Sequence, residues 1–294
     1  MTRVEEILDQ VGSLSPLPGT VLRLIHVIND PQSTVDQIVE TIKYDQAVTS
    51  EMLRIVNSAF FGLTREIQSL HDAMRCLGTV KVLQLVMAVH TNSLLCKPQK
   101  GYGMAPGILW EHSVGVAIAS SLIGERIGIA NRGLLFTAGL LHDVGKVILN
   151  EYVAAEFGEI ARRVAELKIS FLEAEKQVLG FAHDEVGGQI AEKWQLPEPI
   201  VLGIRYHHQP NALDVPDTVV DALHLADCLC LLLGIGLGAD GLSYRADEAV
   251  MERHGLRESD LEMIGAQVLM EVQRVEQLFG EHPSTGESRE LCAT

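Results

Sequence analysis

A histidine and an aspartate, His142 and Asp143, interrupt the apolar stretch from Ala138 to Lys146. The stretch is typical of a buried helix. Neighbouring residues on a helix diverge by about 100°, so this pair can hold a cation from adjacent directions. Lys146 follows one turn later and can share that face, where its ammonium could hold a metal-bound oxygen or a phosphate. We therefore expect a core helix that ends in polar residues able to bind a metal.

Other residues of ligand type stand beside apolar sequence: His112, His183, His207, His208 and Asp227. Pro210 closely follows the histidine pair, which predicts a helix end there. Neutral imidazole suits zinc, iron, manganese or nickel. A single histidine on an apolar face is usually a hydrogen-bonded core residue. Five histidines and two aspartates on separate, largely apolar helices would be costly to bury without a shared cation, so the set predicts a two-metal site.

The ordered pattern H…HD…H…HH…D resembles the HD superfamily of metal-dependent phosphohydrolases, all-helical proteins that cleave phosphomonoesters and phosphodiesters. In this resemblance His142-Asp143 is the doublet that names the superfamily, and His142-Asp143-Val-Gly-Lys146 matches the H-D-x-G-K form of the HD-GYP phosphodiesterases. His207-His208 is followed by Gln209-Pro210-Asn211, with no Gly-Tyr-Pro motif downstream. That departure argues against cyclic di-GMP hydrolysis.

The amino-terminal third resembles the HDOD domain, an HD-related output domain of bacterial signalling proteins. The shared elements are Ser13-Leu-Ser-Pro16-Leu17-Pro18, Lys43-Tyr-Asp45-Gln-Ala47, Leu53-Arg-Ile-Val-Asn57-Ser58 and Ile67-Gln-Ser69-Leu70…Ala73…Leu77-Gly78. The resemblance extends from about residue 5 to about residue 235. Gln46 stands where the family usually has proline, which we interpret as a changed helix start. HDOD domains often lose the metal ligands of their catalytic relatives, whereas this chain retains a complete dinuclear set.

Helical periodicity dominates the chain and strand alternation is scarce, which predicts an all-α protein. We expect an N-terminal helical bundle packed on an HD-superfamily-like helical core, followed by a C-terminal helix. Glycine and proline concentrate between Cys96 and Gly107 and mark a boundary. The expected divisions are an N-terminal subdomain over 1–100, a metal-binding core over 101–235, a C-terminal helical extension over 236–280 and a mobile tail over 281–294.

Charge and hydropathy limit the partners of the protein. A formal net charge of -16 disfavours general attraction to nucleic acids or anionic membranes. The apolar stretch from Cys228 to Ala239 is shorter than the roughly 20 residues that span a bilayer, and the first residues lack a hydrophobic signal core. The 5 cysteines form no C-x-x-C pair or disulfide framework. We therefore expect a cytoplasmic protein; its oligomeric state is left open.

Two functions follow from these observations. The HDOD resemblance implies a bacterial signalling module that binds a protein partner, a nucleotide or another phosphorylated small molecule and carries two divalent metal ions. The alternative is an active phosphohydrolase in which Asp143 bridges the ions, a metal-activated water attacks phosphorus and Lys146 neutralises the developing charge. A plain helical scaffold without metal leaves the buried ionisable groups unexplained.

The nature of the ligands narrows the choice of ion. Imidazole and carboxylate ligands without a thiolate favour iron or manganese over a structural zinc, and the resemblance to the phosphodiesterase branch favours iron, with manganese next. A catalyst needs an open coordination position, whereas a structural site is closed by protein ligands. His224 lies three residues before Asp227 and could support a ligand without binding metal itself.

Overall fold

The computed structural model describes residues 17, 19–30, 32–43, 45–58, 66–239 and 246–279. Within these residues the protein is all-α, as predicted, and its only β pairing is an isolated bridge between Gln99 and Met104. The expected mobile tail over 281–294 and the motif residues Ser13 to Pro16, Pro18 and Tyr44 lie outside the described residues. None of the described helices is long and apolar enough to cross a membrane.

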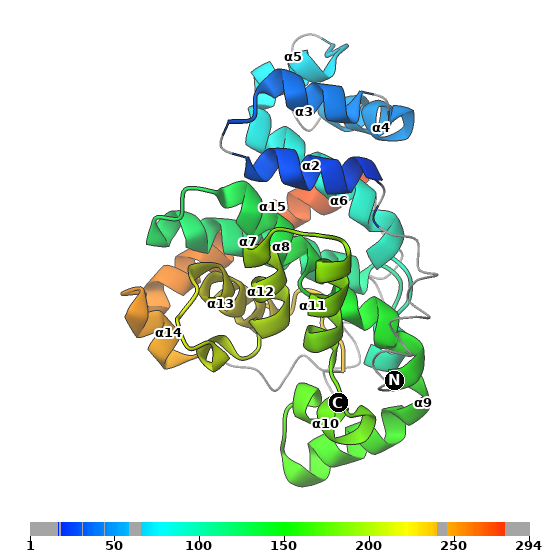
Figure 1. The fold of residues 1–294 in the computed structure, drawn as a ribbon, viewed down its shortest axis with the longest axis vertical. Coiled ribbons are helices and arrows are strands. Elements are labelled where there is room, and N and C mark those ends of the chain that lie inside the picture. The colour runs from blue at the N-terminus through cyan, green and yellow to red at the C-terminus, as the bar shows by residue number, and fades with distance from the viewer. Residues whose placement is uncertain are drawn as a thin grey trace.

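The N-terminal helices form one end of the elongated molecule (Figure 1). Their bounds are α2 Gly19–Asn29, α3 Val35–Ile42, α4 Gln46–Val56, α5 Leu70–Leu77 and α6 Thr79–Leu95. Thr34 and Gln37 form a capping box that begins α3. Asp45 caps α4, which begins at Gln46, because its side chain accepts a hydrogen bond from the Val48 amide at 3.1 Å. Gln46 is therefore the first residue of this helix, directly after the aspartate cap.

The central helices fill the middle of the molecule and include a helical hairpin that projects at the opposite end (Figure 1). They are α7 Ile108–Ile127, α8 Arg132–Leu141, α9 Val144–Leu167, α10 Phe171–Leu179, α11 His183–Lys193, α12 Glu198–Tyr206 and α13 Thr218–Leu232. Helix α7 is buried along most of its length and packs against α8, α13 and α15. Because helices surround it, α7 is apolar on nearly every side, unlike an amphipathic surface helix.

One expectation about this region is wrong. The stretch from Ala138 to Lys146 is not one helix: α8 ends at Leu141 and α9 begins at Val144, with His142 and Asp143 between them. Asp143 leaves the helical backbone at φ -98° and ψ 14°. The new helix direction places Gly145 directly against the backbone of α11. The HD doublet therefore lies at a bend between two helices.

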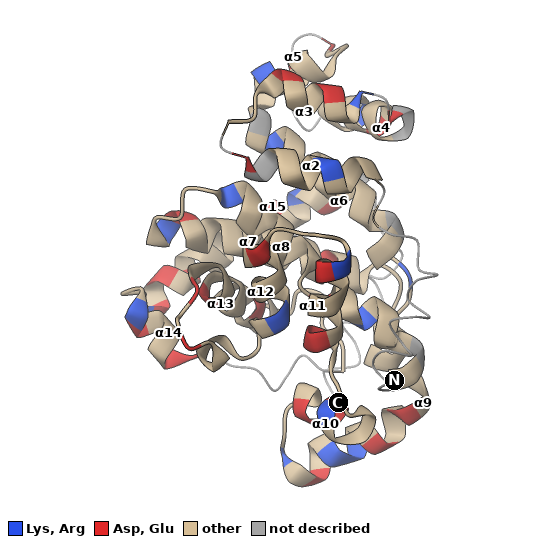
Figure 2. Cartoon of the chain, viewed as in Figure 1, with Lys and Arg blue, Asp and Glu red and all other residues tan. Residues whose placement is uncertain are grey.

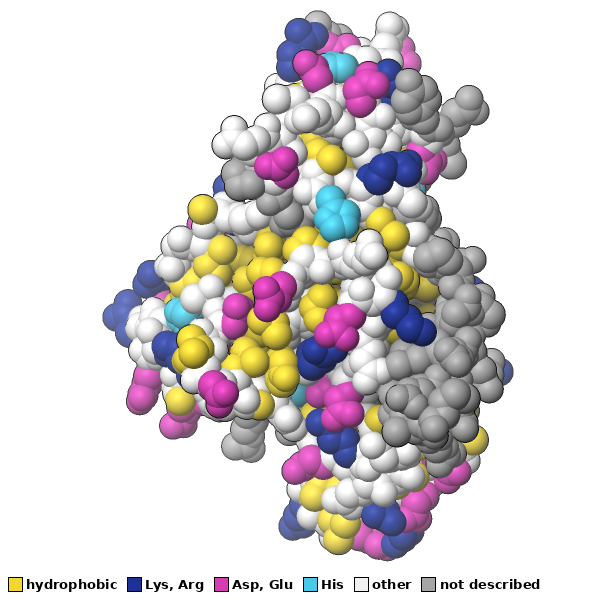
Figure 3. Space-filling view, in the orientation of Figure 1, with side chains coloured by type: hydrophobic (Ala, Val, Ile, Leu, Met, Phe, Trp, Pro, Cys, Tyr) yellow, Lys and Arg dark blue, Asp and Glu magenta, His cyan; other side chains and the backbone are white. Residues whose placement is uncertain are grey.

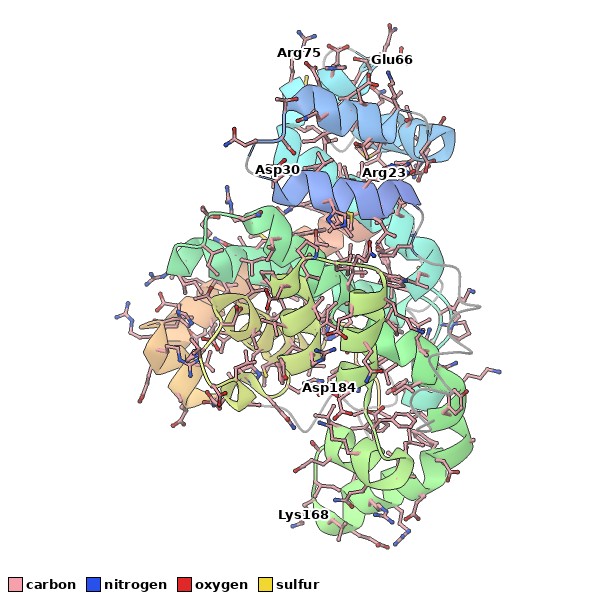
Figure 4. The ribbon with its side chains drawn as sticks, viewed as in Figure 1. Arg23, Asp30, Glu66, Arg75, Lys168 and Asp184 are labelled. Carbon is pink, nitrogen blue, oxygen red and sulfur yellow. The ribbon has the colours of Figure 1, made fainter. Side chains whose placement is uncertain are left out.

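Helices α9 and α10 form the projecting hairpin. Basic and acidic residues are interspersed along it (Figure 2), and Arg162 pairs with Glu159 and Glu166 at 2.8 and 2.5 Å. The turn at the far end is made by Lys168 in a left-handed conformation at φ 53° (Figure 4). By contrast, hydrophobic side chains gather on the middle of the face shown in Figure 3, over α8 and α12.

The C-terminal part contains α14 Glu248–Arg253 and α15 Glu258–Phe279. Helix α15 buries Ile264, Val268 and Val272 and packs on α7. Two short 3₁₀ helices, η2 Lys100–Tyr102 and η3 Pro210–Ala212, complete the described elements. The subdomain limits at residues 100 and 235 stay predictions.

Two hollows open where the N-terminal helices meet the central ones. One, of about 330 Å³, lies between α2, α6 and α8 and includes Val27, Leu83 and Phe136 in its lining. The other, of about 530 Å³, lies between α6, α7 and α15. Arg132 lines both. Neither hollow includes any of the predicted metal ligands.

Candidate metal centre

The fold brings all the predicted ligand residues together from five separate segments. His112 lies near the start of α7, His142 and Asp143 at the α8–α9 bend, His183 at the first position of α11, His207 and His208 just after α12, and Asp227 on α13. They form two groups, Asp143 with His183, His207 and His208, and His112 with His142 and Asp227. Within each group the ligand atoms lie within 4.8 Å of one another.

The ligand side chains of this centre are almost fully buried, although His208 as a whole residue is partly exposed. The exposed fraction of each of these side chains is at most 4%, the largest value belonging to His208. Lys146, which was expected to face a phosphate, is also buried, with 5% of its side chain exposed. Its ammonium lies 2.6 Å from Asp143 Oδ2 and 5.7 Å from the centre of the Tyr102 ring. The charged atoms therefore face one another inside the core.

Hydrogen bonds fix the proton positions on four of the imidazoles. Their partners at Nδ1 are oxygen atoms that can only accept, so Nδ1 carries a proton and Nε2 is the nitrogen that faces the centre. The bonds run from His112 to Ile235 O at 3.0 Å, from His142 to Gly139 O at 2.7 Å, from His207 to Ile204 O at 2.8 Å and from His183 to Glu175 Oε2 at 2.7 Å. All four rings are thus oriented as metal ligands.

Some of these inward-facing atoms are buried without a hydrogen-bond partner. Among the described residues, the Nε2 atoms of His142 and His207 are in this position. A buried polar atom without a partner is costly, and most such atoms in folded proteins have one. A cation is a partner that several lone pairs can share, so the donor set fits a metal.

Asp143 lies between the two groups. Its Oδ1 is 3.5 Å from His183 Nε2 and 3.8 Å from His207 Nε2. Its Oδ2 is 3.4 Å from His142 Nε2 and 3.8 Å from His112 Nε2. One oxygen of the carboxylate therefore faces each group, which is the arrangement required of a residue that bridges two ions.

Asp227 also faces both groups. Its Oδ1 lies 3.0 Å from His112 Nε2, and its Oδ2 lies 3.5 Å from His208 Nδ1. The Nε2 atoms of His183 and His208 are 3.0 Å apart. Two nitrogen ligands on one ion at right angles would be about 3.0 Å apart for bonds of about 2.1 Å. The spacing of these donors is therefore compatible with one coordination sphere.

The electrostatics favour the protonation states that a cation requires for most of these groups. Burial by itself would raise the pKa of Asp143, but the Lys146 charge and His142 outweigh it and hold that pKa well below its ordinary value. Burial and the His142 charge lower the pKa of His207 to about 3. Burial and its histidine neighbours also lower the pKa of His208 well below its ordinary value. At neutral pH this carboxylate is ionised and these imidazoles are neutral.

His183 differs from His207 and His208, as does His112, whose pKa is raised because the hydrogen bond and charge of Asp227 outweigh burial. Burial opposes the protonation of His183, but the charge and hydrogen bond of Glu175 outweigh burial and raise its pKa to about 9. Without metal, this imidazole carries a second proton at neutral pH, which an incoming cation must displace.

Two residues beside the ligands were not predicted. Glu175 on α10 accepts from His183, and Tyr102 in η2 donates to Glu175 at 2.5 Å. An acidic residue on an amphipathic helix gives no sign that it is buried, and nothing in the sequence links it to a tyrosine far along the chain. His224, considered as a support, hydrogen-bonds through Nδ1 to the His207 carbonyl at 2.8 Å. Asp184 follows His183 at the start of α11, on the side facing the hairpin (Figure 4), and lies in neither group.

Comparisons with known proteins agree with the fold. A family model described as the HDOD domain matches residues 14–210. The crystal structure of an HDOD domain protein of unknown function from Geobacter sulfurreducens is 31% identical, with a TM-score of 0.75. The match covers 94% of this chain and 97% of that one.

Two further relatives are longer than this chain. A candidate signal transduction protein from Marinobacter aquaeolei VT8 is 25% identical, with a TM-score of 0.72; the match covers 95% of this chain and 61% of that one. An uncharacterized protein of Treponema pallidum (strain Nichols) is 26% identical over 214 residues, or 70% of this chain. The chain spans 40% of the length of that protein.

Proposed function

Because the chain belongs to the HDOD family, we propose that it is a signal-transduction module that contains a buried dinuclear metal centre and acts by binding a partner. The observation that carries this proposal is the closure of the centre. Ligand side chains no more than 4% exposed leave no described route for a phosphate ester to reach the ions. Catalytic metal sites keep a coordination position open, whereas structural ones are closed by protein.

The two donor groups would hold one ion each, with Asp143 between them. Bound ions would supply positive charge to two buried carboxylates and link five segments of the core. Imidazole and carboxylate donors without thiolate suit iron or manganese, and the resemblance to the HD-GYP phosphodiesterases favours iron, with manganese next. A ligand that binds only the folded state stabilises it by about 2.7 kcal/mol at a free concentration 100 times its Kd. Bound ions would therefore raise the unfolding free energy of the central helices.

A binding partner would find room at the two hollows rather than at the ions. Pockets for small molecules commonly have volumes of about 300–1,000 Å³, a range that includes both hollows at about 330 and 530 Å³. Arg132 lines both and Lys81 lines the larger one. They pair with Glu125 and Glu271 of the larger hollow at 2.7 and 3.3 Å, so a signalling protein or a phosphorylated small molecule would compete with these carboxylates for the cations.

The second candidate function is a metal-dependent phosphohydrolase. The complete donor set and the placement of Lys146 beside Asp143 at 2.6 Å support it. A buried lysine can neutralise charge that develops on phosphoryl oxygens. This reading requires that the centre open to admit a substrate.

The test is to measure metal content and turnover on one anaerobically purified sample, with a panel of phosphate mono- and diesters as substrates. We expect bound metal without turnover, whether or not iron or manganese is added. Phosphate release that Asp143→Ala abolishes, and that Asp184→Asn retains, would establish the hydrolase instead. Failure to bind any metal, even after reconstitution, would exclude both readings.

A further inference from the structure

The imidazole of His183 is held in a different way from those of His112, His142 and His207. The Nδ1 protons of His112, His142 and His207 are donated to backbone carbonyls, whereas that of His183 is donated to the carboxylate of Glu175 at 2.7 Å. A carboxylate partner makes an imidazole a stronger ligand and fixes its ring more firmly than a neutral carbonyl does. His183 belongs to the group that contains Asp143, His207 and His208. The two ion positions are therefore unequal in their support.

The Glu175 carboxylate is itself tightly held. Its side chain is fully buried, and Oε2 also accepts from the backbone amide of His183 at 3.3 Å. Oε1 accepts from the Tyr102 hydroxyl at 2.5 Å. Both oxygens thus have donors, which is the condition for burying a carboxylate at tolerable cost.

Tyr102 reaches this carboxylate from the segment that joins the N-terminal helices to α7. The segment lies directly on α9: a Cβ at Gly101 would meet Asn150 O at 2.4 Å and Ala154 N at 2.7 Å. The Gly101 amide donates to Asn150 Oδ1 at 2.9 Å, and the Tyr102 carbonyl accepts from the Ala239 amide at 2.8 Å. The Tyr102 ring is fully buried and packs against Phe171 at 5.6 Å. The hydroxyl is therefore held in place by backbone contacts on both sides.

We infer that Glu175 and Tyr102 are a positioning pair that sets the affinity of one ion, the one held by His183, and leaves the other ion unaffected. The inference rests on the proposed metal centre. Glu175 orients His183, and Tyr102 orients Glu175. The second group, His112, His142 and Asp227, makes no described contact with either residue. The ions should therefore bind in two separable steps.

The experiment uses Mn²⁺ alone as the probe, with the full chain. Titration of free Mn²⁺ by electron paramagnetic resonance gives the two affinities, and the spectrum distinguishes one isolated ion from a coupled pair. The variants are Glu175→Gln, which keeps an acceptor for His183 but removes the charge, and Tyr102→Phe, which removes only the hydroxyl. Phe171→Leu is the matched control, because it disturbs the packing around Tyr102 without touching either hydrogen bond.

We expect Glu175→Gln to weaken one ion by about 10–100-fold, the usual effect of losing a residue that supports a metal ligand. The isolated-ion spectrum should then persist over a wider range of Mn²⁺. Tyr102→Phe should shift the same ion in the same direction by a smaller factor, and Phe171→Leu should lower thermal stability without changing either affinity. Equal weakening of both ions, or no change in either, would overturn the pair's role while leaving the metal centre intact. A wild-type chain that takes up no Mn²⁺ would instead overturn the proposed function and this inference with it.

Discussion

Replacing Gly145 by alanine should separate the two backbone segments that carry Asp143 and His183. A Cβ at Gly145 would lie 1.9 Å from the His183 carbonyl oxygen, 2.8 Å from its carbonyl carbon and 2.9 Å from the Gly187 amide nitrogen. These are backbone atoms, so no side-chain rotation relieves the contact. The starts of α9 and α11 would have to move apart by about 1.5 Å to reach ordinary van der Waals contact.

The size of the effect follows from two opposing terms. Overpacking in a dense core typically costs about 1–3 kcal/mol, and the upper part of that range applies because backbone must move. Alanine gains up to about 1 kcal/mol over glycine inside a helix. We expect a net loss of about 1–2 kcal/mol in unfolding free energy. Metal binding should suffer more, because ligand distances tolerate only about 0.2 Å and Asp143 Oδ1 already lies 3.5 Å from His183 Nε2.

The assay is thermal and denaturant unfolding of the metal-free and metal-loaded protein, with metal content measured in parallel. Gly158→Ala on the same helix is the control, since a Cβ there meets nothing within 4 Å; it should be neutral or slightly stabilising. Gly145→Ala should lose the stabilisation that metal gives to the wild type. The reasoning is refuted if Gly145→Ala keeps wild-type metal content and the full metal-dependent rise in melting temperature.

Three further predictions concern the charges. Asp143→Ala should remove most bound metal, because it deletes the residue that faces both groups; elemental analysis showing unchanged content would contradict the site. The unfolding free energy of the metal-free protein should be largest near pH 6.5. Below that pH the unfolded chain binds a proton at His207 that the folded chain does not bind, because the folded pKa is about 3, so stability falls. Above it the unfolded chain releases a proton from His183 that the folded chain keeps, because the folded pKa is about 9, so stability falls again. Urea unfolding from pH 4 to 9 checks this, and a flat profile would contradict it. Arg253→Ala should cost up to about 3 kcal/mol in the same assay, because the fully buried Asp221 carboxylate loses two bonds of 2.7 Å; a loss below about 0.5 kcal/mol would show that water or His254 replaces the guanidinium.

The clustering of the predicted ligand residues could be foreseen from the sequence. Histidines and aspartates inside apolar helices need partners wherever the helices pack, and their order matched a known pattern. The all-α fold followed from periodicity in the same way. The bend at His142 and Asp143 could not be predicted, because apolar residues continue across it without interruption. It depends on the contact of Gly145 with α11, which only the folded chain creates.

The support for His183 was hidden for a different reason. Glu175 precedes Lys176 on a helix that carries other charges, and sequence alone does not tell which of its acids is buried. Tyr102, its partner, lies 73 positions away. The burial of the ligand side chains could not be predicted from the sequence either, because it depends on how closely five separate segments pack. The local sequence pattern identifies residue types that need partners when they are buried, but which residues pair across the fold is set by the folded structure.

The spread of the ligands along the chain has a consequence for the order of folding. His112 and Asp227 lie 115 positions apart yet meet at 3.0 Å, so the first ligand is synthesised long before the last. Closing so long a loop is slow compared with forming single helices. The second group of donors cannot assemble until α13 has docked on α7, late in the collapse of the core. An ion that requires this group should therefore accelerate folding little and slow unfolding strongly, so that its removal shortens the lifetime of the folded chain.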